Sequence, residues 1–199
     1  MAWDLTPPPM SNLHDQGVSL TSDKLKDKNI ALLICGSIAA YDTPNLIREL
    51  RRHGASVQPF ASSAALDFVT PMALEWTSGK AAICSLTSDA EHLGGNTEFD
   101  IYLIAPASYN TINKFAQGIA DSAITVTLAS ALGLMEQGKA DIFISPCMHG
   151  SMHNNILIEN MQKLQNFGVT IFPPRQEDGK NKLPAAAELA QLLINEYSQ

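Results

Sequence analysis

Residues 29–61, NIALLICGSIAAYDTPNLIRELRRHGASVQPFA, carry the clearest structural pattern in this chain. NIALLIC and SVQPFA are short, largely apolar runs of strand length. The segment TPNLIRELRRHG between them places Leu46, Ile47 and Leu50 on one face of a helix. Gly54 provides a stop for that helix before the second run begins. The pattern therefore predicts a strand, a helix and a second strand, which is the unit that builds parallel sheets.

The rest of the chain continues this alternation. DIYLIAPA, ADIFISP and GVTIFPP are continuous apolar runs, as expected for parallel strands that helices cover on both faces. The segments 110–133, 152–167 and 184–197 are predicted to be helical, and no internal repeat is visible. We expect an α/β fold: a single-domain, doubly wound, Rossmann-like parallel sheet with flavodoxin-type strand order, right-handed crossovers and helices on both faces.

The N-terminal segment has a different composition from the rest of the chain. Residues 1–27 are polar and contain the consecutive prolines at 7–9, so we expect a flexible tail that could pack on a neighbouring subunit, followed by one folded domain over residues 28–199. The tail lacks the cationic start and apolar core of a signal peptide, and no apolar run has the length of a membrane span. These features predict a cytoplasmic protein with no membrane partner.

Charge and cysteine content limit the binding partners and the cellular compartment that we expect for this chain. The formal net charge is −7 and no block of Lys or Arg occurs, so the chain offers no basic stripe for nucleic acid. The chain contains an odd number of cysteines: Cys35, Cys84 and Cys147. All three lie in apolar surroundings, which favours reduced, buried thiols over a disulfide framework. A reducing compartment is the expectation.

Polar residues follow the predicted strands, where open α/β sheets bind their ligands. Gly36 follows the first strand, and the amides after it open a helix, which is a cradle for an anion. The stretch lacks both a GxGxxG motif and a P-loop, so it indicates a single phosphate, with an ordinary strand-to-helix turn as the alternative. Ser62 and Ser63 follow the second strand, where one hydroxyl could touch the phosphate or both could serve only as helix caps.

Four motifs in order carry a family resemblance: GSIAAY at 36–41, FVTP at 68–71, PASYNT at 106–111 and GIAD at 118–121. From about residue 29 to its end, the chain resembles the family of phosphopantothenoylcysteine decarboxylases and lantibiotic cysteine decarboxylases. The third motif departs from the family pattern only in Tyr109, which replaces an alanine.

The resemblance implies an FMN enzyme that forms trimers, or dodecamers of trimers, with the flavin at a subunit boundary. It also implies that the flavin takes a hydride equivalent from a substrate's C-terminal cysteine, after which the thioaldehyde loses carbon dioxide. His92, eight residues before Asp100, matches the position of the family's acid/base residue, with an exposed loop histidine as the alternative. The residues that the resemblance assigns to FMN are Gly36, Ser37, Ile38, Ser62, Ser63, Thr70, Ala107, Ser108, Tyr109, Asn110, Thr111 and Met148.

The segment after the fourth strand departs from the family. It reads PCMHGSMH at 146–153, so His149 stands where the family's carboxylate-binding asparagine is expected and His153 where a tryptophan is expected. Residues 173–180 contain no cysteine, whereas the family's substrate-clamping segment does. We take His149 as a second catalytic candidate. Cys147, His149 and His153 are also a possible, incomplete set of metal ligands.

Two functions from different classes, and one non-enzymatic alternative, remain open from the sequence. The first is FMN-dependent decarboxylation of a small molecule or peptide that ends in cysteine. The second is a flavin oxidoreductase resembling the archaeal-type flavoprotein and dihydromethanopterin reductase branch, which the change at His149 favours. A flavin-binding regulatory subunit is the non-enzymatic alternative, although such subunits tend to lose the histidine that His92 matches. The start expected of a flavin prenyltransferase is absent.

Overall fold

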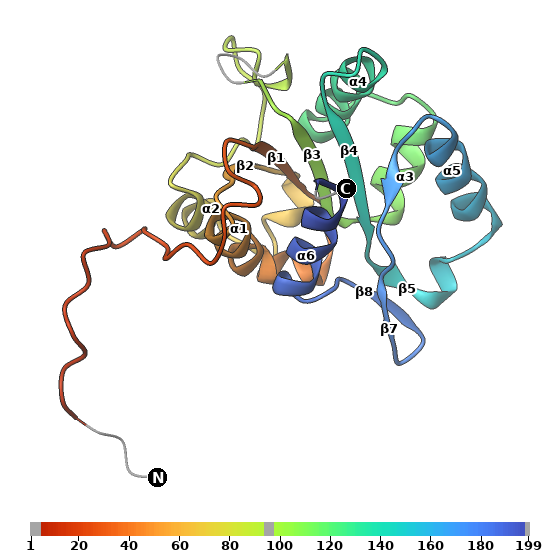
Figure 1. The fold of residues 1–199 in the computed structure, drawn as a ribbon. Helices are drawn as coiled ribbons and strands as arrows, with labels where there is room; N and C mark the ends of the chain where they lie inside the picture. The colour runs from red at the N-terminus through yellow and green to blue at the C-terminus, as the bar shows by residue number, and fades with distance from the viewer. Residues whose placement is uncertain (1–4, 94–97, 198–199) are drawn as a thin grey trace.

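A computed structural model describes residues 5–93 and 98–197 of the chain (Figure 1). Its centre is a five-stranded parallel sheet in the order β2–β1–β3–β4–β6. This is the flavodoxin-type order, so the predicted fold class is confirmed. The strands are β1 (Asn29–Ile34), β2 (Ser56–Ala61), β3 (Ile101–Ala107), β4 (Asp141–Pro146) and β6 (Thr170–Ile171).

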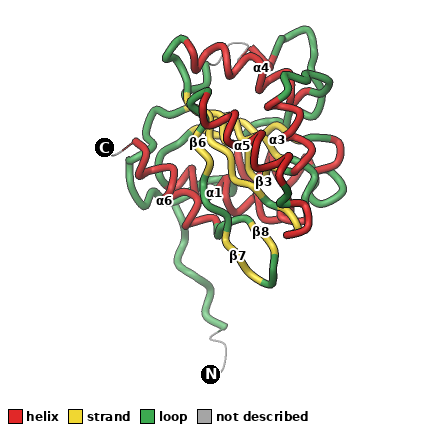
Figure 2. Tube along the Cα trace, turned by 90° about the vertical axis from the view of Figure 1, so that its right-hand side faces the viewer, coloured by secondary structure: helices red, strands yellow, loops and turns green. Residues whose placement is uncertain are grey.

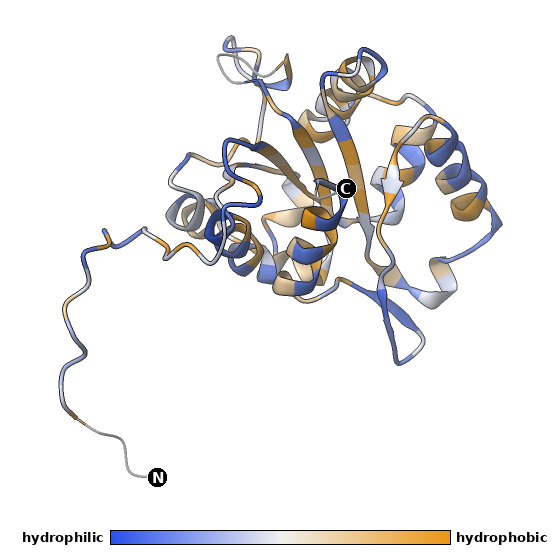
Figure 3. Cartoon of the chain, in the orientation of Figure 1, coloured by the Kyte–Doolittle hydropathy of each residue, from blue (hydrophilic) through white to orange (hydrophobic). Residues whose placement is uncertain are grey.

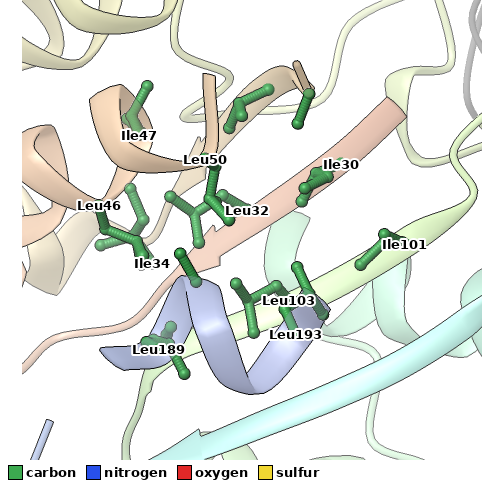
Figure 4. Close-up of a cluster of buried hydrophobic side chains, with 14 of the residues drawn as sticks. Ile30, Leu32, Ile34, Leu46, Ile47, Leu50, Ile101, Leu103, Leu189 and Leu193 are labelled. Carbon is green, nitrogen blue, oxygen red and sulfur yellow. The ribbon is translucent and has the colours of Figure 1, made fainter. Parts of the chain in front are cut away.

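Helices cover both faces of the sheet, because alternate side chains of the central strands are apolar on both sides (Figures 2 and 3). On one face, Leu50 of α1 and Leu193 of α6 pack on Leu32 and Leu103 (Figure 4). On the other face, the buried side chains of α3, α4 and α5 form a second core. The helices are α1 (Thr43–Arg52), α2 (Pro71–Ser78), α3 (Tyr109–Ala116), α4 (Ala123–Glu136), α5 (Asn155–Asn166) and α6 (Ala186–Tyr197).

The predicted helical segment 110–133 is two helices rather than one. Gly118 adopts φ +70°, a left-handed conformation that ends α3. Ser122 then opens α4 with a capping box. The backbone N–H of Thr125 donates a hydrogen bond to the Ser122 hydroxyl, and the backbone N–H of Ser122 donates one to the Thr125 hydroxyl. Local capping therefore divides a stretch whose apolar pattern is continuous.

The second half of the expected flexible tail is attached to α1. The Thr21 amide donates to the Arg52 carbonyl and the Leu25 amide to the His53 carbonyl, each at 2.8 Å. Leu25 is fully buried in the core beside α1. Carbonyls at the end of a helix lack intrahelical partners, so they are natural acceptors for a passing chain. The domain boundary at residue 28 stays a prediction, but ordered structure begins before it.

A small antiparallel sheet lies beyond the main one, in the order β5–β8–β7. It consists of β5 (Met148–His149), β7 (Arg175–Glu177) and β8 (Lys180–Lys182). Asp178 and Gly179 join β7 to β8 with φ of 52° and 66°, the conformation of the tight hairpin turns that an Asp-Gly pair favours. Figure 1 shows this hairpin at the end of the sheet where β4 leads into β5.

Candidate active site at the carboxyl edge

The loops after the central strands meet at the carboxyl edge of the sheet. The Ser62 amide donates to the Ile34 carbonyl at 3.0 Å, and the Cys147 amide donates to the Ala107 carbonyl at 3.0 Å. The Ser37 hydroxyl donates to Cys147 Sγ at 3.4 Å. Loops that are far apart in the sequence therefore form one continuous surface, at the place where such sheets bind ligands.

Gly36 allows two of these loops to approach closely. A Cβ atom at this position would lie 2.5 Å from the Cβ of Ala64, a distance that real Cβ atoms do not tolerate. The sequence indicated a glycine that lets the backbone approach a ligand. The structure shows that its close neighbour within the chain is the start of the short 3₁₀ helix η2 (Ser63–Ala65).

Hydroxyl groups cap the helices that begin at this edge. Ser62 Oγ accepts a hydrogen bond from the Ala65 backbone N–H, with 3.2 Å between N and Oγ. Ser108 Oγ accepts one from the Thr111 backbone N–H, at 3.3 Å. Among the described residues the Ser62 hydroxyl has no acceptor, so its hydrogen is free to donate to an anion. Ser37 caps the 3₁₀ helix η1 (Ile38–Asp42) in the same way. Capped helix starts with a free hydroxyl fit the phosphate that the resemblance implies.

The other residues assigned to the cofactor are distributed along the same edge. Thr70 caps α2, and Ser63 and Asn110 are exposed on the first turns of their helices. Ala107, Thr111 and Met148 are buried. The Tyr109 hydroxyl donates to Asn154 Oδ1 at 3.4 Å, which links α3 to the start of α5.

A pocket of about 680 Å³ opens beside these loops. One wall comes from η1 and the end of β4 and includes Ser37, Ile38 and Cys147. The opposite wall comes from the hairpin β7–β8 and the chain that leads into α6. Met148 and His149 also line the pocket, where β5 pairs with β8 of the hairpin. The pocket is large enough for a small-molecule ligand.

The hydrogen bonds of His149 determine which of its ring nitrogens carries the proton. Its Nδ1 atom accepts the Ser151 backbone N–H at 3.2 Å and lies 2.8 Å from Ser151 Oγ. A backbone N–H can only donate, so Nδ1 is an acceptor and the proton of the neutral ring is on Nε2. His149 therefore offers one N–H donor from a fixed ring, where an asparagine would offer a carboxamide N–H.

The hairpin wall is cationic. Lys182 pairs with Glu177 at 3.1 Å and with Asp178 at 3.3 Å, and the hydrogen bond to Glu177 raises the pKa of Lys182. Arg175 pairs with Glu177 at 3.2 Å. Lys180 lines the pocket and has no ion pair among the described residues. The wall thus carries one ammonium group that is available to an anionic ligand.

The cysteines are free thiols, as the sequence predicted. Burial raises the pKa of the Cys35 thiol, although hydrogen bonds with Thr111 and the Ser108 backbone lower it. Burial also raises the pKa of Cys84. A raised pKa keeps a thiol protonated, so these side chains behave as small apolar groups rather than nucleophiles.

The structure does not bring His92 to this pocket within one chain. His92 belongs to the 3₁₀ turn η3 (Glu91–Leu93), which precedes β3. Figure 1 shows this segment, in yellow-green, beside α4 at the edge of the sheet where the strands begin. His92 Nδ1 is buried without a hydrogen-bond partner among the described residues. The two candidate histidines therefore lie at opposite edges of the sheet.

From the sequence, the family's substrate-clamping segment is expected to be missing, because residues 173–180 contain no cysteine. The structure instead forms a hairpin from this segment and the residues that follow it, and Arg175, Lys180 and Asn181 line the pocket. The Asp178-Gly179 pair was the available signal, since it predicts a two-residue hairpin between short strands. Three-residue strands give too weak a pattern for the rest of the hairpin to be recognised.

The structure gives no support to the metal alternative. In residues 5–93 and 98–197, no group of three His, Cys, Asp or Glu side chains is arranged to hold a metal ion. His149 and His153 instead use Nδ1 for Ser151 and Asn181. Within the same ranges, every helix is too short or too polar to cross a bilayer.

Comparison with known families identifies the class of protein. The model of the Flavoprotein family matches residues 18–198, so the chain belongs to this family. A coenzyme A biosynthesis bifunctional protein CoaBC from Thermococcus kodakarensis is 38% identical over 178 residues, which cover 87% of this chain and 43% of that protein. The corresponding protein from Methanocaldococcus jannaschii is 34% identical and covers 87% of this chain. This chain spans less than half the length of these relatives.

Solved structures show the same fold. An FMN-dependent cysteine decarboxylase, SpaF, superposes with a TM-score of 0.74 at 21% identity, covering 88% of this chain and 99% of that chain. A PPC decarboxylase variant complexed with pantothenoylaminoethenethiol gives 0.71 at 21% identity, with 87% and 100% covered. The peptidyl-cysteine decarboxylase EpiD gives 0.70 at 24% identity, with 84% and 99% covered. The family resemblance predicted from the sequence motifs is confirmed.

Proposed function

We propose that this chain is an FMN-dependent decarboxylase that acts on a cysteine conjugate with a free carboxylate, of the phosphopantothenoylcysteine type. The observation that carries the proposal is the pocket of about 680 Å³ lined by strand-end loops and the hairpin, with His149 in its lining. The relatives named for coenzyme A biosynthesis favour a small precursor of that cofactor over a peptide.

The strand-end loops hold the cofactor in this proposal. Ser62 donates its free hydroxyl hydrogen to the phosphate, and the amides that open η1 and α3 point toward the same end. Ile38 and Phe68 are exposed apolar side chains at this edge, and they fit contact with a flavin ring. When bound, FMN supplies the oxidation of the cysteine that makes loss of carbon dioxide easy.

His149 and Lys180 hold the substrate carboxylate. They are register partners in the β5–β8 ladder, and both line the pocket. His149 contributes its Nε2 N–H and Lys180 contributes its ammonium group, which are both donors suited to a carboxylate. This pair replaces the carboxamide that the family uses.

His92 serves as acid/base at the cofactor of a neighbouring subunit. Its position at the opposite edge leaves it no route to the pocket of its own chain, and its Nδ1 has no partner among the described residues. Met72 and Trp76, exposed on α2, are apolar surface that a neighbouring subunit would cover. We propose a homo-oligomer, a trimer or a larger assembly of trimers, in the cytoplasm.

Anaerobic absorbance spectra of the FMN-loaded protein test the proposal. Adding the cysteine conjugate should bleach the flavin bands, because substrate oxidation reduces the flavin, while NAD(P)H alone should leave them unchanged. Bleaching by NAD(P)H and not by the conjugate would favour the oxidoreductase alternative, which the change at His149 also favours. Failure to retain FMN after reconstitution would refute both functions.

Subunit mixing tests the position of His92. His92→Asn lacks the acid/base group, and Ser62→Glu places a carboxylate where the phosphate is expected. Each variant alone should be inactive. Mixed oligomers obtained by co-expression should regain part of the activity, because a Ser62→Glu subunit still supplies His92 to a neighbour that binds FMN. Absence of any recovery in verified mixed oligomers would contradict action across subunits.

A further inference from the structure

The hairpin β7–β8 is attached to the segment that carries His149 by very few contacts. The β5–β8 ladder contains only the pairs Met148 with Asn181 and His149 with Lys180. Both strands of the hairpin are three residues long, and β7 is exposed throughout. Two short strands do not form a stable hairpin alone, so its position depends on what else it touches.

One further contact is a close approach of two backbones. A Cβ atom at Gly150 would lie 2.2 Å from the carbonyl oxygen of Gly179, at the turn of the hairpin. Gly150 opens the 3₁₀ turn η4 (Gly150–Met152) directly after His149. Only a glycine at this position lets the hairpin turn lie against η4.

The other contact joins two side chains. The Asn181 amide Nδ2 lies 2.8 Å from Nδ1 of His153, which follows η4. Asn181 is only 7% exposed, although its hairpin neighbour Lys180 is exposed. A buried amide is costly to leave without a partner, and His153 is the side-chain partner of Asn181 among the described residues.

This pair lies where three hollows meet. Asn181 lines the pocket of about 680 Å³, a cavity of about 250 Å³, and a hollow of about 400 Å³ between η4 and the hairpin. His153 lines the second cavity together with Leu157 and Phe172. If Asn181 moved, the wall of the pocket would move with it, and Lys180 on the same strand would leave its place beside His149.

We propose that His153 and Asn181 are positioning residues that hold the hairpin β7–β8 closed as the outer wall of the substrate pocket, and that Gly150 permits this closure. The part that concerns substrate rests on the proposed function of the pocket. Neither side chain acts on the reacting atoms. Their hydrogen bond fixes the wall that carries Lys180, so it contributes to substrate binding rather than to the chemical step.

The test compares His153→Leu with the rescue variant His153→Asn, whose amide can place a polar atom near the position of Nδ1. In His153→Leu, KM for the cysteine conjugate should rise about tenfold while kcat stays within about twofold, as expected for loss of a binding wall. His153→Asn should restore most of the loss in KM. A fall in kcat with unchanged KM would overturn the positioning role.

Trypsin provides a second readout that needs neither cofactor nor substrate. Lys180 and Lys182 are cleavage sites in the hairpin, and exposed Lys139 before β4 is an internal control. Cleavage at the hairpin should be about tenfold faster in His153→Leu than in the natural chain, with cleavage at Lys139 unchanged. Equal hairpin cleavage in both proteins would overturn the proposal. If no variant or natural protein turned over the substrate, only the proposed function would fail.

Gly150→Ala tests the backbone contact, with Gly133→Ala as the matched control. Gly133 lies in α4 with open space around its position, so its alanine variant meets nothing. Gly150→Ala should speed hairpin cleavage as His153→Leu does, and Gly133→Ala should not. If both alanine variants were cleaved like the natural chain, the role assigned to Gly150 would be overturned.

Discussion

The two edges of the main sheet differ in how their polar groups are satisfied. At the carboxyl edge, the hydroxyls of Ser37, Ser62 and Ser108 take part in bonds that tie neighbouring loops together or cap helices, and Ser145 near the end of β4 is the exception. Toward the amino edge, His92 Nδ1 and the Tyr102 hydroxyl are buried without partners among the described residues.

The carboxyl edge therefore satisfies most of its polar groups within one chain, whereas toward the amino edge two buried polar atoms have no partner among the described residues. Buried polar atoms without partners are uncommon in native proteins, and each asks for an explanation. A role of His92 at a neighbouring subunit explains its unpaired ring nitrogen. For Tyr102, a hydroxyl in the core beside Phe99, we expect only a cost in stability.

The largest effect on turnover should come from a substitution at the amino edge of the sheet. We expect His92→Asn to lower turnover by about 100- to 10,000-fold, the usual contribution of a general acid or base, while FMN content stays unchanged. Steady-state rates and the flavin-to-protein absorbance ratio measure the two properties. Full activity would remove His92 from the chemistry, and loss of FMN would indicate a structural role instead.

The same substitution at the carboxyl edge should have a smaller effect. His149→Asn keeps an N–H donor, so we expect KM to change by only about threefold. His149→Leu removes the donor and should raise KM by about tenfold to 100-fold, as for loss of a hydrogen bond to a charged group. Equal kinetics for the leucine variant and the natural chain would contradict the carboxylate role.

Packing at the carboxyl edge gives a prediction for stability. Gly36→Ala should lower the free energy of unfolding by about 1–3 kcal/mol, because the new Cβ would lie 2.5 Å from that of Ala64. The double variant with Ala64→Gly removes the clash and should recover most of the loss. Urea denaturation measures both. A double variant no more stable than Gly36→Ala would show that this contact is not the cause.

The smallest effect concerns Tyr102. Burial raises the pKa of Tyr102 to about 12, so the folded state favours the protonated phenol more than the unfolded state does. With respect to this group, the folded state keeps its full stability below pH 10 and loses stability as the pH rises from 10 toward 12, because the buried phenol must lose its proton or the chain must unfold. Tyr102→Phe should flatten this alkaline loss and change the free energy of unfolding by about 1 kcal/mol or less at neutral pH. An unchanged alkaline profile would rule out Tyr102 as its source.

The sequence predicted the sheet, and the strand-end position of several candidate residues, for a physical reason. Buried parallel strands are continuous apolar runs, and the residues after them must gather at one edge. Ser37, Ile38, Met148 and His149 therefore lie where their position after a strand predicts. The Ser37 bond to Cys147 links loops 110 residues apart, and only the folded chain shows it.

The hairpin wall of the pocket and the position of His92 could not be predicted from apolar runs and the residues that follow them. The hairpin depends on contacts such as that of His153 with Asn181, which leave no periodic pattern in the sequence. His92 was placed by its spacing from Asp100, and spacing along a chain does not say which edge of the sheet a side chain faces. The anchoring of the tail through Leu25 likewise depends on a single buried side chain.

Identification of the reaction products would show whether this chain decarboxylates a cysteine conjugate. The FMN-loaded protein would be incubated without oxygen with the phosphopantothenoyl conjugate of cysteine, and the products would be identified by mass spectrometry. We predict release of carbon dioxide and a product that has lost the cysteine carboxyl group, in the natural chain but not in His92→Asn. That product would be an enethiol accompanied by reduced flavin, or the saturated thiol if the flavin returns its two electrons to the enethiol. Recovery of intact conjugate from protein that retains its flavin would contradict the claim that this chain is a cysteine decarboxylase.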